Sequence, residues 1–107
     1  MKTSIDKAMH FAAQTLGSTL GEAGYPAASR ALLGAQDAAG VVAACRNVAA
    51  RLQILHAPAP FHEACRALEE AATLGIRGDL QELRPAADRL TRALVAASGG
   101  RLQEGGR

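Results

Sequence analysis

The longest regular pattern in the chain is DAAGVVAACRNVAARLQIL, residues 37–55. Within it a stripe of apolar side chains recurs at steps of three or four, which is the spacing of one face of an α-helix. The stripe consists of Val41, Cys45, Val48, Leu52 and Leu55. Asp37 precedes it, where an aspartate side chain can cap the N-terminus of a helix. We therefore predict a long amphipathic helix from Asp37 to about Leu55.

Two helices are predicted upstream of this stretch. The hydroxyl of Thr3 precedes the carboxylate of Asp6 by three residues, which is the spacing of a capping box that starts a helix. Glycines at positions 21 and 24 are expected to end this first helix. Pro26 suits the first turn of a shorter helix, which we expect to end at Gly34 and to bury Leu32 or Leu33. The stripe of the first helix is Ile5, Met9, Ala12, Leu16 and Leu20.

Two more helices are predicted downstream, after the break APAP at residues 57–60, because proline disfavours helix in the residue before it. The first of them is expected to end at Gly75, and Asp79 is expected to cap the second. Pro85 lies inside the second pattern, where we expect either a kink or a one-turn prelude to the main helix. The two stripes are Phe61, Cys65, Leu68 and Ala72, and then Leu83, Ala87, Leu90 and Leu94.

The composition supports helices rather than a sheet. Apolar residues make up 49% of the chain and aromatic residues only 3%, with alanine and leucine dominant. Both are strong helix formers, and short loops between helices favour antiparallel neighbours. We predict an all-α fold, an antiparallel up-and-down four-helix bundle with a short extra helix. Residues 1–100 are expected to form a single domain and residues 101–107 a flexible C-terminal tail.

Charge and hydropathy exclude several classes of function. The 12 basic and 10 acidic residues give a net charge of +2, with neither a basic stripe nor stacking aromatics, so we expect no nucleic-acid partner. No apolar run is long enough to cross a membrane. The N-terminus meets Lys2 at once and lacks the apolar core of a secretory signal. These features predict a cytoplasmic protein that does not interact with membranes.

The side chains capable of metal or redox chemistry are few. Cys45 and Cys65 fall on apolar stripes, so we expect buried, reduced thiols, with metal or redox use as the alternative. His56 and His62 flank the proline break, and either imidazole is a candidate to approach the other or Cys65. A zinc site needs four such ligands, or three and an open position. We therefore predict no metal site and no cofactor.

No catalytic arrangement is visible either. His10 lies with Asp6 and Gln14 off the apolar stripe of the first helix, so we expect it to be a solvated surface residue. Glu69 and Glu70 are adjacent in the sequence and therefore diverge on a helix, which leaves no carboxylate pair for acid–base work. The sequence predicts a protein that is not an enzyme.

A second face of the helix at residues 37–55 consists of small residues around one amide, with two arginines beside it. Small side chains allow another surface to approach the helix closely. We predict that these residues bind a partner; the alternative is that they pack against a neighbouring helix of the same chain. The face consists of Gly40, Ala43, Ala44, Arg46, Asn47, Ala50 and Arg51.

From Leu33 to Ala97, about two thirds of the chain, the pattern resembles a histidine phosphotransfer (Hpt) domain. FHEACRALEEAA at residues 61–72 and GDLQEL at residues 78–83 are similar to the C-terminal half of such a domain. LGAQD at residues 33–37 is similar to the segment that leads into the family's phosphorylated helix. The resemblance implies a helical bundle of bacterial two-component signalling, in which Hpt domains relay phosphate to and from receiver domains.

The chain departs from this family at the decisive position. The family carries a histidine in mid-helix, followed three and four residues on by lysine and glycine; here Asn47 stands at that position, followed by Ala50 and Arg51. An amide cannot form a phosphoramidate. The resemblance therefore implies a non-catalytic adaptor or modulator that docks a receiver domain, a kinase or a similar partner. Two alternatives stay open: a homodimeric, chaperone-like structural bundle, and a phosphorelay protein that uses an atypical histidine.

Overall fold

The computed structural model describes residues 3–99, and over this range the chain forms five α-helices and no strand. The all-α prediction is therefore confirmed for the described residues. The predicted tail at 101–107 lies outside them. The helices are α1 (Ser4–Glu22), α2 (Pro26–Leu33), α3 (Ala38–Ile54), α4 (Ala59–Arg77) and α5 (Leu80–Ala97).

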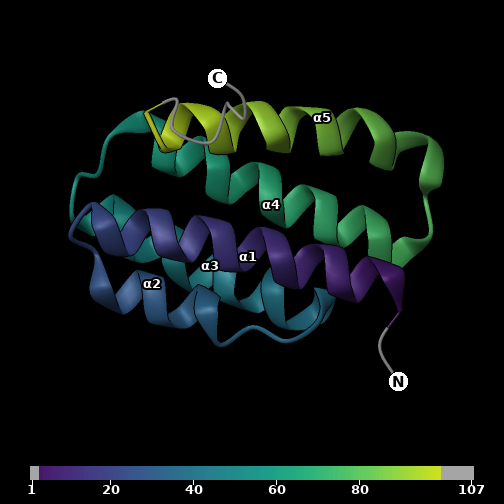
Figure 1. Ribbon diagram of the computed structural model, residues 1–107, viewed down its shortest axis with the longest axis horizontal. Helices are drawn as coiled ribbons and strands as arrows, with labels where there is room; N and C mark the ends of the chain where they lie inside the picture. The colour runs from purple at the N-terminus through teal and green to yellow at the C-terminus, as the bar shows by residue number, and fades with distance from the viewer. Residues whose placement is uncertain (1–2, 100–107) are drawn as a thin grey trace.

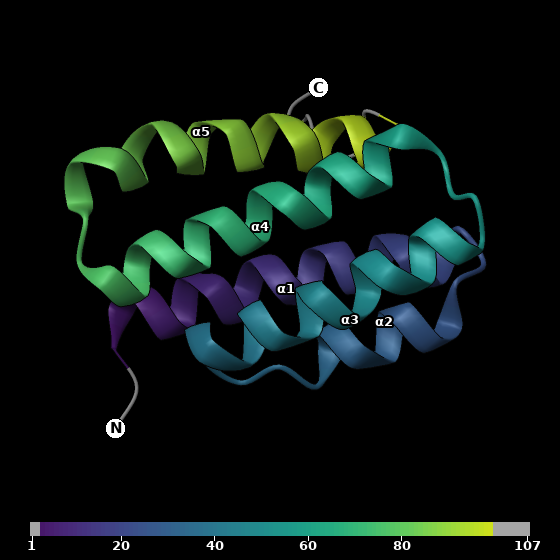
Figure 2. The ribbon, with the colours of Figure 1, turned by 180° about the vertical axis from the view of Figure 1, so that it is seen from behind.

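The helices lie side by side along the long axis of the molecule, and each runs opposite to the one before it (Figures 1 and 2). α4 makes the most extensive contacts of the five helices, because it packs closely against both α3 and α5 and also against α1. α2 packs against α1 and α3, whereas α5 packs along α4 and barely touches α1. α3 lies on the far side of the molecule in Figure 1 and faces the viewer in Figure 2.

The predicted helix starts are confirmed by their capping hydrogen bonds. The Oγ1 atom of Thr3 accepts from the backbone N–H of Asp6 at 3.0 Å, and Asp6 Oδ2 accepts from the N–H of Thr3 at 3.2 Å, which completes the capping box. Asp37 Oδ1 accepts from the N–H of Gly40 at 2.8 Å. Asp79 likewise accepts from the N–H of Glu82. Each bond satisfies a donor that the first turn of a helix otherwise leaves unpaired.

The predicted end of α4 at Gly75 is wrong. The helix continues to Arg77 and ends at Gly78, whose φ of +75° is the left-handed conformation that glycine adopts without strain. Gly75 has a different role, because a Cβ atom there would lie 2.6 Å from Cγ2 of Ile5. The absence of a side chain at Gly75 therefore allows α4 to approach the first turn of α1 closely.

Most of the predicted stripes form the core, but two members do not. Leu55 is 56% exposed, because α3 ends at Ile54 and the chain turns towards α4 at Leu55. Ala87 is exposed and its neighbour Ala86 is fully buried, so the buried stripe of α5 passes through Ala86, while the leucines of the predicted stripe keep their places at the core. The fully buried large side chains are Leu16, Leu20, Leu32, Val41, Cys45, Val48, Leu52, Cys65 and Leu68.

α5 is continuous through Pro85, so the predicted one-turn prelude is wrong and a kink stays a prediction. In α2 the buried leucine is Leu32, whereas Leu33 is 36% exposed.

The polar side of α1 is not simply solvated, and the prediction for His10 is wrong. Its Nδ1–H donates to the carbonyl oxygen of Ala35 at 2.8 Å, and the ring is half-buried. One turn on, Gln14 Nε2 donates to the carbonyl oxygen of Leu33 at 2.9 Å. One turn before, Asp6 Oδ1 accepts from the N–H of Ala38 at 2.9 Å. Three successive turns of α1 thus hold the connection between α2 and α3.

Asp6 caps two helices at once, α1 through Thr3 and α3 through Ala38. We expect Asp6→Ala to lower the free energy of unfolding by about 2 kcal/mol, because two helix N-termini lose an acceptor and a single cap contributes about 1 kcal/mol. Thr3→Ala, which affects α1 alone, should cost about half as much. Urea denaturation followed by circular dichroism measures both values. Equal losses in the two variants would contradict the double role of Asp6.

Candidate partner-binding face

The predicted binding residues lie along one side of α3, which we call the Asn47 face. Ala43, Arg46, Asn47, Ala50 and Arg51 are exposed, so they are not buried against another helix of the chain.

Gly40 and Ala44 are half-buried and serve the fold instead. A Cβ atom at Gly40 would lie 3.1 Å from the capping oxygen of Asp37, and Ala44 packs against the core. The Asn47 face available to a partner therefore consists of the five exposed residues.

Hydrogen bonds hold the polar groups of this face in place. Arg51 Nε donates to Asn47 Oδ1 at 2.8 Å, one turn apart on α3. Arg46 Nε forms an ion pair with Glu69 Oε2 on α4 at 3.0 Å. The Arg46 side chain is 72% exposed, so solvent screens this pair and it contributes little to stability. Its effect is to hold the Arg46 guanidinium group at the side of α3 that faces α4.

The face has donors but no nucleophile and no acid–base pair. It presents amide and guanidinium N–H groups between small alanine side chains. Guanidinium groups bind carboxylates and phosphates with two parallel hydrogen bonds, which suits an acidic protein surface. The chemistry of the Asn47 face is therefore that of recognition.

An apolar groove adjoins the Asn47 face at the C-terminal end of α3. Its volume is about 360 Å³. Arg51 lines the groove and also belongs to the Asn47 face. Ile54 is 76% exposed and Leu55 56% exposed on one wall. On the other wall the ring of Tyr25 contacts the ring of Phe61 edge-to-face, with centroids 5.7 Å apart. Sequence reasoning missed this groove because it assigned Leu55 to the core stripe.

The histidines and cysteines do not assemble into a site. His62 Nε2–H donates to the carbonyl oxygen of Ala57 at 3.0 Å, and His56 is exposed with a φ of 54°. Cys45 and Cys65 are buried and free, as predicted, and Cys65 Sγ–H donates to the carbonyl oxygen of Cys45 at 3.1 Å. Over residues 3–99 no group of three or more His, Cys, Asp or Glu side chains is placed to hold a metal ion.

The two thiols should be unreactive in the folded chain. A hydrogen bond with the Cys65 side chain, together with burial, raises the pKa of the Cys45 thiol. A hydrogen bond with Cys45 lowers the pKa of the Cys65 thiol, but both side chains are buried out of reach of the reagent, so we expect neither cysteine to react with Ellman's reagent in native buffer. Both should react at once in concentrated guanidinium chloride. Rapid reaction of either thiol in native buffer would contradict the packing of α3 against α4.

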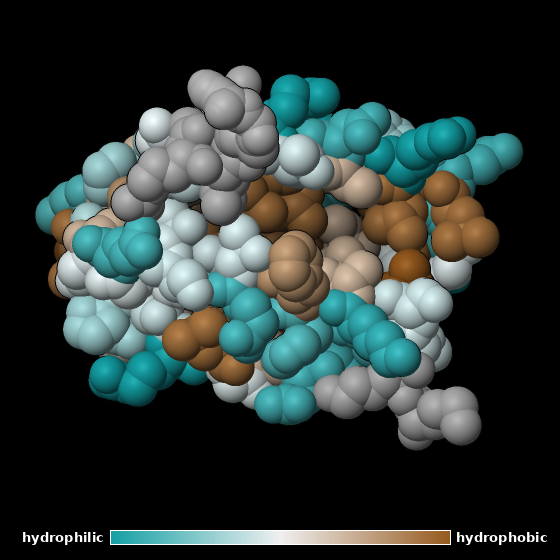
Figure 3. All heavy atoms as spheres, viewed as in Figure 1, coloured by the Kyte–Doolittle hydropathy of each residue, from teal (hydrophilic) through white to brown (hydrophobic). Residues whose placement is uncertain are grey.

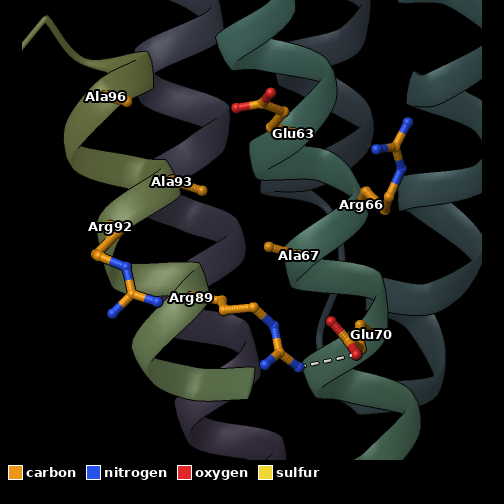
Figure 4. Close-up of a pocket in the computed structure, with 8 residues that line it drawn as sticks. All are labelled: Glu63, Arg66, Ala67, Glu70, Arg89, Arg92, Ala93 and Ala96. Carbon is orange, nitrogen blue, oxygen red and sulfur yellow. Dashed lines mark hydrogen bonds and ion pairs between the residues drawn. The ribbon is translucent and has the colours of Figure 1, made fainter. Parts of the chain in front are cut away.

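A second surface groove lies between α4 and α5, with a volume of about 340 Å³ (Figure 4). Ala67 and Ala93 line it together with charged residues of both signs. Arg89 reaches across it to Glu70, where Nη2 lies 3.0 Å from Oε2, while Arg66 points away from α5. Both partners of this ion pair are about half exposed, and the two carboxylates of the groove offset two of its three arginines. We interpret this groove as a solvated contact between two helices.

None of the described helices is long and apolar enough to span a membrane. Comparison of the chain with protein-family models, with curated proteins and with solved structures gave no match.

Proposed function

We propose that this chain is a non-catalytic, Hpt-like adaptor or modulator that docks a receiver domain or a similar signalling protein through the Asn47 face. The resemblance to Hpt domains supplies the class of partner. One structural observation carries the proposal: Asn47 and its small neighbours Ala43 and Ala50 are exposed on α3. These alanines are not used to bring two helices of the chain together, and their small side chains leave the backbone around Asn47 open to a partner.

The polar and apolar parts of the surface suggest what the partner presents. Small side chains at Ala43 and Ala50 let a second surface approach the backbone of α3. Arg46 and Arg51 favour an acidic partner, because complementary charge sets orientation and association rate. The groove beside Ile54 and Leu55 can take an apolar side chain at the rim of the same contact.

Architecture and location are part of the proposal. We take the four long helices α1, α3, α4 and α5 as one bundle, with α2 as the short extra helix. α2 reverses the chain between α1 and α3, so these two run in the same direction, and the strict up-and-down order predicted from the sequence does not hold for the four long helices. In this arrangement α3 is the second long helix, the one that the resemblance assigns to the phosphorylated position. Reduced thiols at Cys45 and Cys65 agree with function in the cytoplasm.

The proposed adaptor transfers no phosphate. The Asn47 amide is not a phosphoryl acceptor, and its oxygen already accepts a hydrogen bond from Arg51. His10 and His62 each use one ring nitrogen to hold a backbone carbonyl, which gives both imidazoles a structural role.

The proposal is tested by measuring affinity for receiver domains encoded in the same genome, both unmodified and activated with beryllofluoride. Ala43→Glu should weaken binding at least about tenfold, or by about 1.4 kcal/mol, because it inserts a bulky carboxylate where the surfaces meet. Ala96→Glu is the matched control: it makes the same change at an exposed alanine of α5, which does not contact α3. Equal effects of the two substitutions, or no binding to any receiver domain, would reject the proposal.

A further inference from the structure

An apolar groove of about 430 Å³ lies between α1 and α5, and five residues of each helix line it. It opens on the broad face of the molecule, where Figure 3 shows hydrophobic side chains between the two helices. α5 packs along α4 but barely touches α1, so the apolar sides of α1 and α5 are not closed against each other. This groove lies away from the Asn47 face, which belongs to α3.

The groove has almost no polar character. None of its lining residues is charged, and its only polar side chains are Thr15 and Thr91. Each hydroxyl donates within its own helix, Thr15 to the carbonyl oxygen of Phe11 at 3.1 Å and Thr91 to that of Ala87 at 3.0 Å. Neither hydroxyl is therefore free to donate a hydrogen bond to a polar ligand in the groove. What the groove can recognise is another apolar surface.

Phe11 stands on the wall of the same groove and is 73% exposed. Leu90 and Leu94, on the α5 side, are buried and half-buried. One face of the molecule therefore carries both a projecting aromatic ring and a hollow lined by aliphatic side chains. Such a surface is complementary to itself, which is the requirement for a two-fold symmetric contact between identical chains.

We infer that a second copy of this chain occupies the groove, in a symmetric homodimer that places Phe11 of each protomer in the groove of its partner. The two grooves carry no charge and meet without repulsion, whereas a partner selected by charge would find nothing to bind in them. A stable interface buries about 800 Å² on each partner. The broad face, 33 by 32 Å, is large enough to supply that area.

The C-terminal segment is a poorer occupant on chemical grounds. Residues 100–107, GRLQEGGR, contain a single large apolar side chain, Leu102. One leucine among glycines and charged residues does not match a groove lined by ten residues without a charge. The homodimer is independent of the proposed function, because it leaves the Asn47 face open.

Sedimentation velocity over a concentration series tests the inference. We expect the wild-type chain to associate to twice the chain mass. We expect Phe11→Glu to weaken association at least about 100-fold, because it would bury an unpaired carboxylate in each groove. Ile54→Glu is the matched control, since Ile54 is 76% exposed but lies on α3, and it should leave the dimer intact. Both sites are exposed, so thermal unfolding curves should confirm that both variants are folded.

Three results would overturn the inference. One is a wild-type chain that stays monomeric up to about 0.5 mM, because self-association weaker than that would not sustain a functional dimer. Another is a dimer that Phe11→Glu leaves unchanged or that Ile54→Glu disrupts. The third is a full-length chain that is monomeric but dimerises when residues 100–107 are removed, which would show that the C-terminal segment occupies the groove.

Discussion

Leu52→Ala is expected to lower the free energy of unfolding by about 3 kcal/mol, whereas Leu55→Ala should change it by less than about 0.5 kcal/mol. The two leucines lie three positions apart on the same predicted stripe. Leu52 is fully buried, but Leu55 is 56% exposed where α3 ends. The same atoms are deleted in both variants, yet only the first deletion leaves a cavity in the core.

Urea denaturation of the two variants, followed by circular dichroism at one protein concentration, provides the comparison. The dependence of the unfolding free energy on urea should be alike in both, so the transition midpoint alone should report the difference. Similar losses in the two variants would mean that Leu55 is buried and that the apolar stripe of α3 extends past Ile54.

The second large effect is a gain of the ability to accept a phosphoryl group. We expect the triple variant Asn47→His, Ala50→Lys, Arg51→Gly to accept an acid-labile phosphoryl group from a phosphorylated receiver domain, while the wild-type chain accepts none. The substitutions restore the histidine, lysine and glycine that the Hpt resemblance places at these positions. Arg51→Gly also removes the guanidinium group that holds the side chain at position 47. A glycine inside the helix costs about 1 kcal/mol, which the core should tolerate.

Radiolabelled phosphate followed by acid and alkali treatment distinguishes a phosphohistidine from other products. Ala49→His is a suitable control, because it adds a histidine at an exposed position of the same helix that belongs neither to the Asn47 face nor to the adjoining groove. Labelling of the wild-type chain would contradict the non-catalytic role. A folded triple variant that binds the receiver domain but stays unlabelled would contradict the assignment of position 47.

The features predicted correctly from the sequence are local ones. The caps at Thr3, Asp37 and Asp79 depend on atoms within three residues of one another, and the stripe of α3 depends on the helical repeat alone. These signals can be interpreted without knowing which helices pack against one another.

The features that sequence reasoning missed depend on distant neighbours. Asp6 and His10 bond to residues 32 and 25 positions away, and nothing in their own helix indicates these long-range hydrogen bonds. Gly75 packs against Ile5, which lies 70 positions earlier in the chain. The sequence does not reveal this contact, and a glycine there predicts only the end of a helix. In α5 both Ala86 and Ala87 fit an apolar stripe, and only the position of α4 decides which of them is buried.

The exposure of the Asn47 face also depends on distant neighbours and could not be predicted from its own helix. The helix at 37–55 has small residues on two sides, and its sequence does not say which side another helix covers. The structure shows Ala43 and Ala50 exposed and Ala44 packed against the core. The face was predictable as a pattern, while its exposure follows from where α2 and α4 lie.

Chemical-shift mapping tests the central claim most directly. A ¹⁵N-labelled chain is titrated with an activated receiver domain, and the backbone amide signals that move are assigned to residues. We expect the largest changes on α3 from Ala43 to Arg51 and on Ile54, with α5 unaffected. Changes confined to the groove between α1 and α5, or no changes with any receiver domain, would contradict docking through the Asn47 face.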